Sequence, residues 1–118
     1  MFDEVTTVNL LYDFYGKLLT KRQGEVMQLY YEENLSLSEI AEEFGISRQA
    51  VHDALKNAEK ALRGYEEKLG IIKKFEETQK AVFKIDSIIN EMAEDENMPL
   101  QFKGKILEVK EIIDNINE

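Results

Sequence analysis

The segment SLSEIAEEFGISRQAVHDALK, residues 36–56, constrains the fold more than any other part of the chain. It begins with a capping-box pattern, Ser36 followed three residues later by Glu39. A glycine, Gly45, can take a positive φ at low cost and so end a short helix, and Ser47 can cap the next one. The pattern predicts two helices that are joined by a turn of only three or four residues, which is a helix-turn-helix.

The apolar residues of this segment recur where two crossing helices would need a core. Ala41 is small at the point of closest approach, and the rest of the wedge comprises Ile40, Phe44, Ile46, Val51 and Leu55. The opposite face of the second helix then carries Ser47, Arg48, Gln49, His52, Asp53 and Lys56. A recognition helix presents such positions to the major groove of DNA, with its N-terminal residues nearest the bases.

The residue types on this face fit contacts with nucleic acid. Arg48 and Gln49 can each make paired hydrogen bonds, to guanine and to adenine respectively. Ser47 and the free N–H groups of the helix start suit a phosphate. Asp53 fits DNA less well, although it could accept from cytosine or pair with a neighbouring lysine. The predicted nucleic-acid-binding set is Ser47, Arg48, Gln49, His52, Lys56, Lys60, Arg63, Lys21 and Arg22.

The remainder of the chain also favours helix, because it contains only one proline and six glycines. No stretch indicates a strand, so we expect an all-α fold. Apolar spacing predicts helices over about 4–18, 21–33 and 48–63. Thr20 and Gln23 form a second capping-box pattern, and Asn34 is a candidate C-terminal cap.

Beyond residue 64 the apolar residues keep close to a 3-4 alternation, interrupted by the polar Gln79. This pattern predicts a long amphipathic helix, roughly 45 Å in length if it is continuous over 65–94. Pro99 can start a last helix, whose apolar face would comprise Phe102, Ile106, Val109, Ile112, Ile113 and Ile116. We therefore expect a helix-turn-helix domain over 1–64 and a helical appendage over 65–118, which either forms a homodimer or folds back on its own chain.

Charge and composition exclude several classes of function. The net charge is −9, of which residues 36–64 contribute −1 (five acids, four bases) and residues 65–118 contribute −5 (thirteen acids, eight bases). This acidity argues against broad affinity for polyanions. Cysteine is absent and His52 is the only histidine, so metal sites built on thiolates or imidazoles are not expected. No phosphate-binding glycine loop or nucleophile elbow occurs, and we expect neither an enzyme nor a cofactor.

The N-terminal residues and the lengths of the apolar runs indicate where in the cell the protein is expected. The sequence begins MFDEVTTVNL, with acidic residues where a signal peptide carries basic ones. No apolar run approaches the roughly 20 residues that cross a bilayer. We therefore expect a cytoplasmic protein with no membrane insertion.

Longer motifs carry a resemblance to known proteins. The stretch LLTKRQGEVMQLYYEENLSLSEIAEEFGISRQAVHDALKNAEKALR resembles sigma-factor region 4, with its E-I-A motif, glycine turn, S-R and trailing A…L-R. More closely, LYDFYGKLLTKRQ, YYEENLSLSEIAEEFGISRQAVHDALK and YEEKLG resemble the YlxM-like family of bacterial helix-turn-helix proteins, over roughly residues 8–70. The resemblance implies a region 4-like helical domain without a wing. It also implies a part in the signal recognition particle pathway, because genes of this family lie beside that of the particle's GTPase.

These observations lead to a non-enzymatic regulatory or accessory protein and leave its ligand open. One hypothesis is a DNA-binding regulator, which would need a dimer to read a second half-site. The other is an accessory protein of the signal recognition particle that contacts its GTPase or its RNA. A duplex RNA hides its major groove, whereas a basic GTPase component would suit an acidic partner. A purely structural helical adaptor is a third hypothesis.

Overall fold

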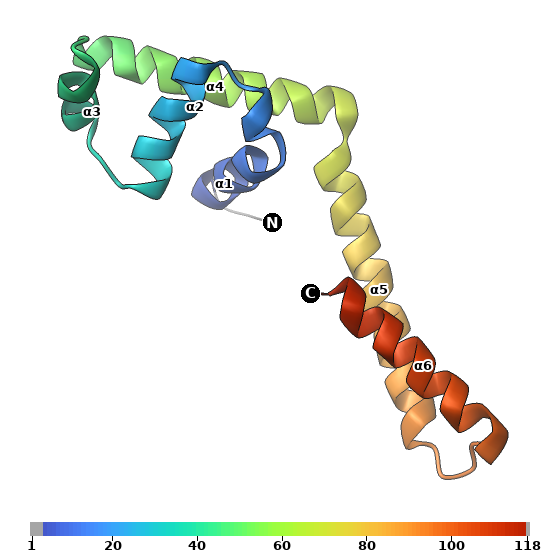
Figure 1. The fold of residues 1–118 in the computed structure, drawn as a ribbon. Helices are drawn as coiled ribbons and strands as arrows, with labels where there is room; N and C mark the ends of the chain where they lie inside the picture. Colours follow the sequence, from blue (N-terminus) through green and yellow to red (C-terminus); the bar gives the residue numbers. More distant parts are fainter. Residues whose placement is uncertain (1–3, 118) are drawn as a thin grey trace. The chain divides into compact units, whose positions relative to one another are not determined.

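The computed structural model describes residues 4–117, which form helices joined by short connections and contain no strand (Figure 1). The elements are α1 (Glu4–Tyr15), the 3-10 turn η1 (Gly16–Leu18), α2 (Lys21–Met27), the π-helical turn η2 (Gln28–Glu32), α3 (Leu37–Phe44), α4 (Arg48–Leu69), α5 (Ile71–Glu94) and α6 (Leu100–Ile116). The predicted all-α fold is confirmed. None of the described helices is both long enough and apolar enough to cross a membrane.

Packing divides the chain into two units, and the N-terminal unit ends at Ile72 while the C-terminal unit begins at Lys73. Sequence analysis placed a boundary after Gly64, but α4 passes through that residue and ends at Leu69, with Gly70 (φ 61°) as its C-cap. The long helix considered over 65–94 is therefore not continuous, because it is divided between the end of α4 and α5. A residue with left-handed backbone stops α4, and α5 begins directly after it.

The three predicted N-caps of the N-terminal unit are confirmed. Thr20 Oγ1 accepts a hydrogen bond from Gln23 N (3.2 Å), and Thr20 N donates to Gln23 Oε1 (3.1 Å). Ser36 and Glu39 form the same reciprocal pair, both at 3.1 Å. Ser47 Oγ accepts from a backbone N–H in the first turn of α4 at 3.0 Å. Each side chain satisfies a donor that a helix start leaves unpaired, so these residues set where α2, α3 and α4 begin.

The turn between α3 and α4 depends on Gly45, as predicted. Gly45 has φ 66° and donates to Glu42 O (3.3 Å), while Ile46 N donates to Ala41 O (3.0 Å). These two hydrogen bonds are the pair of a Schellman motif, which closes a helix with a left-handed residue. The turn is therefore short and fixed, and it directs the chain from α3 straight to the N-cap of α4.

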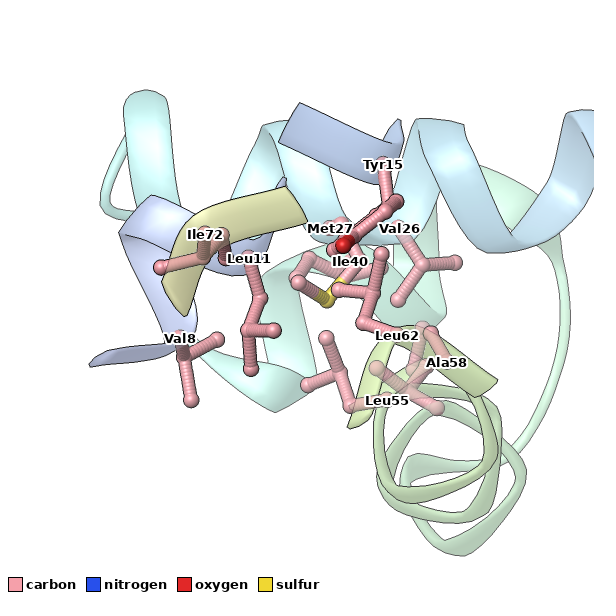
Figure 2. Close-up of a cluster of buried hydrophobic side chains, with 12 residues drawn as sticks. Val8, Leu11, Tyr15, Val26, Met27, Ile40, Leu55, Ala58, Leu62 and Ile72 are labelled. Carbon is pink, nitrogen blue, oxygen red and sulfur yellow. The ribbon is translucent and has the colours of Figure 1, made fainter. Parts of the chain in front are cut away.

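The core of the N-terminal unit fills the space between α4 and the three helices that it contacts, α1, α2 and α3 (Figure 2). Of the predicted wedge, Ile40, Val51 and Leu55 are buried, whereas Phe44 and Ile46 are half-buried at its edge. Burying a side chain of this size contributes about 1.5–3 kcal/mol. Among the described residues of this unit, the buried side chains are Val8, Leu11, Tyr15, Val26, Met27, Ile40, Ala41, Val51, Leu55, Ala58, Leu62 and Ile72.

The Gly70 turn is fixed by a buried tyrosine of α1. Tyr15 Oη donates to Glu66 Oε1 (2.5 Å) and accepts from Ile71 N (3.2 Å), and Glu66 Oε1 also accepts from Ile72 N (3.0 Å). Burial and the hydrogen bond with Glu66 raise the pKa of Tyr15. The start of α5 is thus capped by side chains of α1 and α4, and Ile72 packs in the core of the N-terminal unit.

The C-terminal unit is a hairpin in which α6 runs back along α5 after the loop of residues 95–99 (Figure 1). Pro99 stands at the N-cap of α6, as predicted. Of the expected apolar face of α6, Ile106 and Ile113 are buried and Val109 is half-buried. The other three members, Phe102, Ile112 and Ile116, are exposed.

Candidate nucleic-acid interface

The first half of α4 separates a buried side from an exposed side. Val51, Leu55, Ala58 and Leu62 are buried against the rest of the N-terminal unit. All the positions that sequence analysis assigned to the opposite face are exposed, namely Ser47, Arg48, Gln49, His52, Asp53 and Lys56. The core therefore orients α4 so that this face is available to a ligand of the N-terminal unit.

Four basic residues follow one another at four-residue intervals along this exposed face. Arg48, His52, Lys56 and Lys60 lie on one side of α4 because residues four apart are neighbours on a helix. We call these four residues the basic stripe, which extends about 18 Å at 1.5 Å per residue. Within the described residues, no hydrogen bond or ion pair engages the side chains of Arg48, Lys56 and Lys60, so their charges are free for an anionic ligand.

Gln49 and His52 both interact with Asp53. Gln49 Nε2 donates to Asp53 Oδ1 (3.0 Å), and His52 Nδ1 lies 3.6 Å from the same oxygen. Sequence analysis expected the Gln49 amide to bind adenine, and Asp53 either to accept from cytosine or to pair with a neighbouring lysine. In the structure Asp53 instead contacts these two neighbours on its own helix. Gln49 must release Asp53 before its Nε2 can donate to a base.

The start of α4 offers backbone donors more readily than the Ser47 side chain. Ser47 Oγ already accepts from Ala50 N, and Ser47 O accepts from Val51 N. The N–H groups of Arg48 and Gln49 have no partner within the helix, as is usual for its first residues. A phosphate placed here would accept from these two N–H groups and from the Ser47 hydroxyl.

Two of the three other predicted residues contact groups of the same chain. The Arg22 guanidinium lies 4.5 Å from the centroid of the Phe44 ring, in a cation–π contact that joins α2 to the end of α3. Arg63 Nη2 pairs with Glu4 Oε1 at 2.8 Å. Lys21 is exposed at the start of α2. A role of these three residues in binding nucleic acid stays a prediction.

Contacts between residues distant in sequence hold α4 in place, and sequence analysis missed them. Tyr31 Oη donates to Glu59 Oε1 (2.5 Å), which joins η2 to α4, and the Arg63–Glu4 pair joins α4 to α1. Burial, followed by the hydrogen bond with Glu59, raises the pKa of Tyr31. Nothing in the local pattern indicates these pairs, because their members are 28 and 59 residues apart.

The helix that precedes α4, α3, carries an acidic surface. Glu39, Glu42 and Glu43 are exposed and line a shallow hollow together with Leu35. In a helix-turn-helix the first helix crosses the DNA backbone, where acidic residues would repel phosphates. The N-terminal unit therefore presents a free basic stripe and an acidic surface on consecutive helices.

Comparisons with known proteins agree with this architecture. The sequence profile of the family described as "Putative helix-turn-helix protein, YlxM / p13 like" matches residues 2–101. A UPF0122 protein of Desulforamulus reducens is 49% identical over 87 residues, which cover 74% of each chain. Another, from Bacillus cereus strain AH187, is 50% identical over 91 residues, or 77% of this chain and 83% of its own length. A relative from Bacillus anthracis shows the same identity and coverage.

Proposed function

Because this chain belongs to the YlxM / p13-like family of helix-turn-helix proteins, we propose that it is a non-enzymatic regulatory protein that binds duplex DNA through the exposed face of α4. One observation carries the proposal. Three charged side chains of the basic stripe, Arg48, Lys56 and Lys60, are exposed along the first 13 residues of the capped helix α4 and have no partner among the described residues.

The proposed mode of binding divides these residues by role. Arg48, in the first turn, contacts a guanine edge in the major groove, and such a bidentate contact contributes about 1–3 kcal/mol of discrimination. Lys56 and Lys60, further along α4, contact phosphates and fix the register. Gln49 contacts a base only after its hydrogen bond with Asp53 is broken and replaced by one with that base. The acidic surface of α3 keeps the affinity low.

The proposal is tested by titrating the protein with a short mixed-sequence DNA duplex at two salt concentrations. Binding should weaken as the salt concentration rises, and replacing Arg48 with Ala should weaken it by a further factor of about ten or more. Lys68→Ala is a matched control, since it also removes one exposed positive charge from α4 but lies beyond the basic stripe. Equal effects of the two substitutions, or no duplex binding at low salt, would contradict the proposal.

The second candidate is an accessory role in the signal recognition particle pathway, through contact with the particle's GTPase or RNA. The observation that favours it is the acidic surface formed by Glu39, Glu42 and Glu43, which complements a basic protein surface. The same titration, run with the purified GTPase and with the particle's RNA, distinguishes the candidates. Tight GTPase binding without duplex binding would replace the first proposal by the second. In either role we propose that the protein acts in the cytoplasm.

A further inference from the structure

The hairpin of α5 and α6 leaves much of its apolar surface uncovered. Within the described residues of the C-terminal unit, only Ile106 and Ile113 are buried, and Val82 and Ile89 of α5 are half-buried. A cavity of about 150 Å³ lies where the two helices meet, lined by Ala93, Lys103, Ile106 and Leu107. Helices in water derive most of their stability from packing an amphipathic face, and this hairpin packs only a small part of its own.

Four of the exposed apolar side chains of α5 form a regular stripe, whereas Phe83, which is 74% exposed, lies outside it. The half-buried residues Gln79, Val82, Asp86 and Ile89 recur at three- and four-residue intervals, together with the half-buried Glu76 and Asn90. A second series with similar spacing lies roughly 100° further round the helix. It comprises Ala81, Ile85, Ile88 and Met92, all of them exposed, with Ile85 at 48% and Ile88 at 50%. A helix that packs one side against its hairpin partner and carries an exposed apolar stripe beside that side is typical of a four-helix bundle, where each helix has two neighbours.

One exposed residue of α6 extends this surface. Ile85 directly precedes the half-buried Asp86, and Ile112 directly precedes the buried Ile113. In an antiparallel helix pair, residues that directly precede inward-facing positions lie on the same side of the pair. Ile112, which is 53% exposed, therefore lies on the same side as the α5 stripe. We call Ala81, Ile85, Ile88, Met92 and Ile112 the uncovered face.

The charges of the two helices are polarised along the chain. Residues 71–84 carry four lysines and two glutamates (+2), and residues 85–96 carry five acids (−5). Residues 100–110 carry three lysines and one glutamate (+2), and residues 111–117 carry two acids (−2). Two copies of either helix repel each other when parallel and attract each other when antiparallel. The uncovered face is thus electrostatically suited to a second copy of itself in antiparallel orientation.

We propose that the α5–α6 hairpin is a dimerisation element, and that two copies pack their uncovered faces together as an antiparallel four-helix bundle. Four of the five residues of this face lie on α5, so α5 of one copy packs against α5 of the other, and the two-fold axis passes between Ile85 and Ile88. The overlapping part of the hairpin, about 26 Å long and 20 Å wide, approaches the roughly 600 Å² per partner of small specific interfaces. The inference does not depend on what the N-terminal unit binds.

Sedimentation equilibrium of the full chain at micromolar concentrations tests the proposal. The unaltered protein should be a dimer, and Ile88→Asp should weaken dimerisation by about thirtyfold or more, because it places a carboxylate at the centre of the interface. Ser87→Asp is the matched control: it adds the same charge at the neighbouring exposed position, away from the uncovered face, and should leave the dimer intact. A monomeric unaltered protein, or a dimer that tolerates Ile88→Asp, would overturn the proposal.

Cross-linking provides a second measurement that does not require a destabilised variant. The chain has no cysteine, so a single introduced thiol can pair only with its copy in another molecule. Ile88→Cys should form a disulfide-linked dimer on mild oxidation, because residues beside a two-fold axis come within disulfide distance. Ser87→Cys should link much less. A dimer in which Ile88→Cys does not link, or links no better than Ser87→Cys, would exclude this face.

Discussion

At the scale of single residues, Glu39 makes the stability of the start of α3 depend on pH. Its carboxylate accepts from Ser36 N at 3.1 Å, and this hydrogen bond, with that from the Ser36 side chain, lowers the pKa of Glu39 from its ordinary value of 4.5. A carboxyl group whose pKa is lower in the folded state stabilises the fold above its ordinary pKa. That contribution is lost as the pH falls through the lowered value.

We therefore expect the free energy of unfolding of the unaltered protein to exceed that of Glu39→Gln at neutral pH. The difference should shrink as the pH falls below 4.5, the ordinary pKa of the group, because the protonated acid and the amide then carry the same charge. Urea unfolding of both proteins at a series of pH values measures this difference in the free energy of unfolding. Glu42→Gln serves as a control, since Glu42 lies in the same helix and caps nothing. A difference that does not vary with pH would contradict this account.

The residue scale also shows which contacts local sequence can predict. Thr20, Ser36 and Ser47 were identified as caps because each bonds within three residues of itself. The pairs Tyr15–Glu66 and Glu4–Arg63 join residues 51 and 59 positions apart. They depend on how α1 packs against α4, and no spacing rule within one element reveals that.

At the scale of elements, sequence analysis predicted the number of helices better than their ends. Gly64 and Gly70 look alike in the sequence, but only Gly70 ends a helix. The difference arises from tertiary contacts, because Tyr15 and Glu66 cap the first N–H groups of α5 immediately after Gly70. The π-helical turn η2 was also missed, since a single wide turn leaves the apolar periodicity of its helix almost unchanged.

The two glycines should respond to alanine in opposite directions. Gly64→Ala should stabilise the protein by about 0.5–1 kcal/mol, because the position is helical and a Cβ would meet no atom within 4 Å. Gly70→Ala should destabilise it by about 1 kcal/mol, because φ is 61° there. Chemical denaturation of the two variants checks both signs. Stabilisation by Gly70→Ala would mean that α4 does not end in a left-handed residue.

At the scale of the whole molecule, the two candidate ligands differ in the sign of their own charge, because DNA is a polyanion and the alternative ligand is a basic protein. The chain carries −9 overall, yet the basic stripe stands free on the helix that follows the acidic surface of α3. A polyanion must approach the stripe against that acidity, whereas a basic protein would be attracted by it. Sequence analysis found both charge groups but could not show that they lie on consecutive helices with their side chains exposed.

The variant that combines Glu42→Gln with Glu43→Gln should therefore separate the hypotheses by the direction of its effect. Binding to duplex DNA should strengthen several-fold at low salt, because two repulsive charges near the phosphates are removed. Binding to the signal recognition particle's GTPase should instead weaken. Lys68→Gln, remote from both surfaces, controls for a general change of charge. Weakened DNA binding in the double variant would exclude the proposed orientation of α3 on the duplex.

The uninterrupted length of α4 connects two distant parts of the N-terminal unit. Its 22 residues run from the turn that follows α3 to the Gly70 turn, and buried side chains along this length attach it to the core. At 1.5 Å per residue, α4 is about 33 Å long. In the proposed complex with DNA, Arg48 at the start of α4 contacts the ligand, while Glu66 near its end accepts a hydrogen bond from Ile72 N in the first turn of α5. One uninterrupted helix therefore connects the proposed ligand-binding residue to the start of α5.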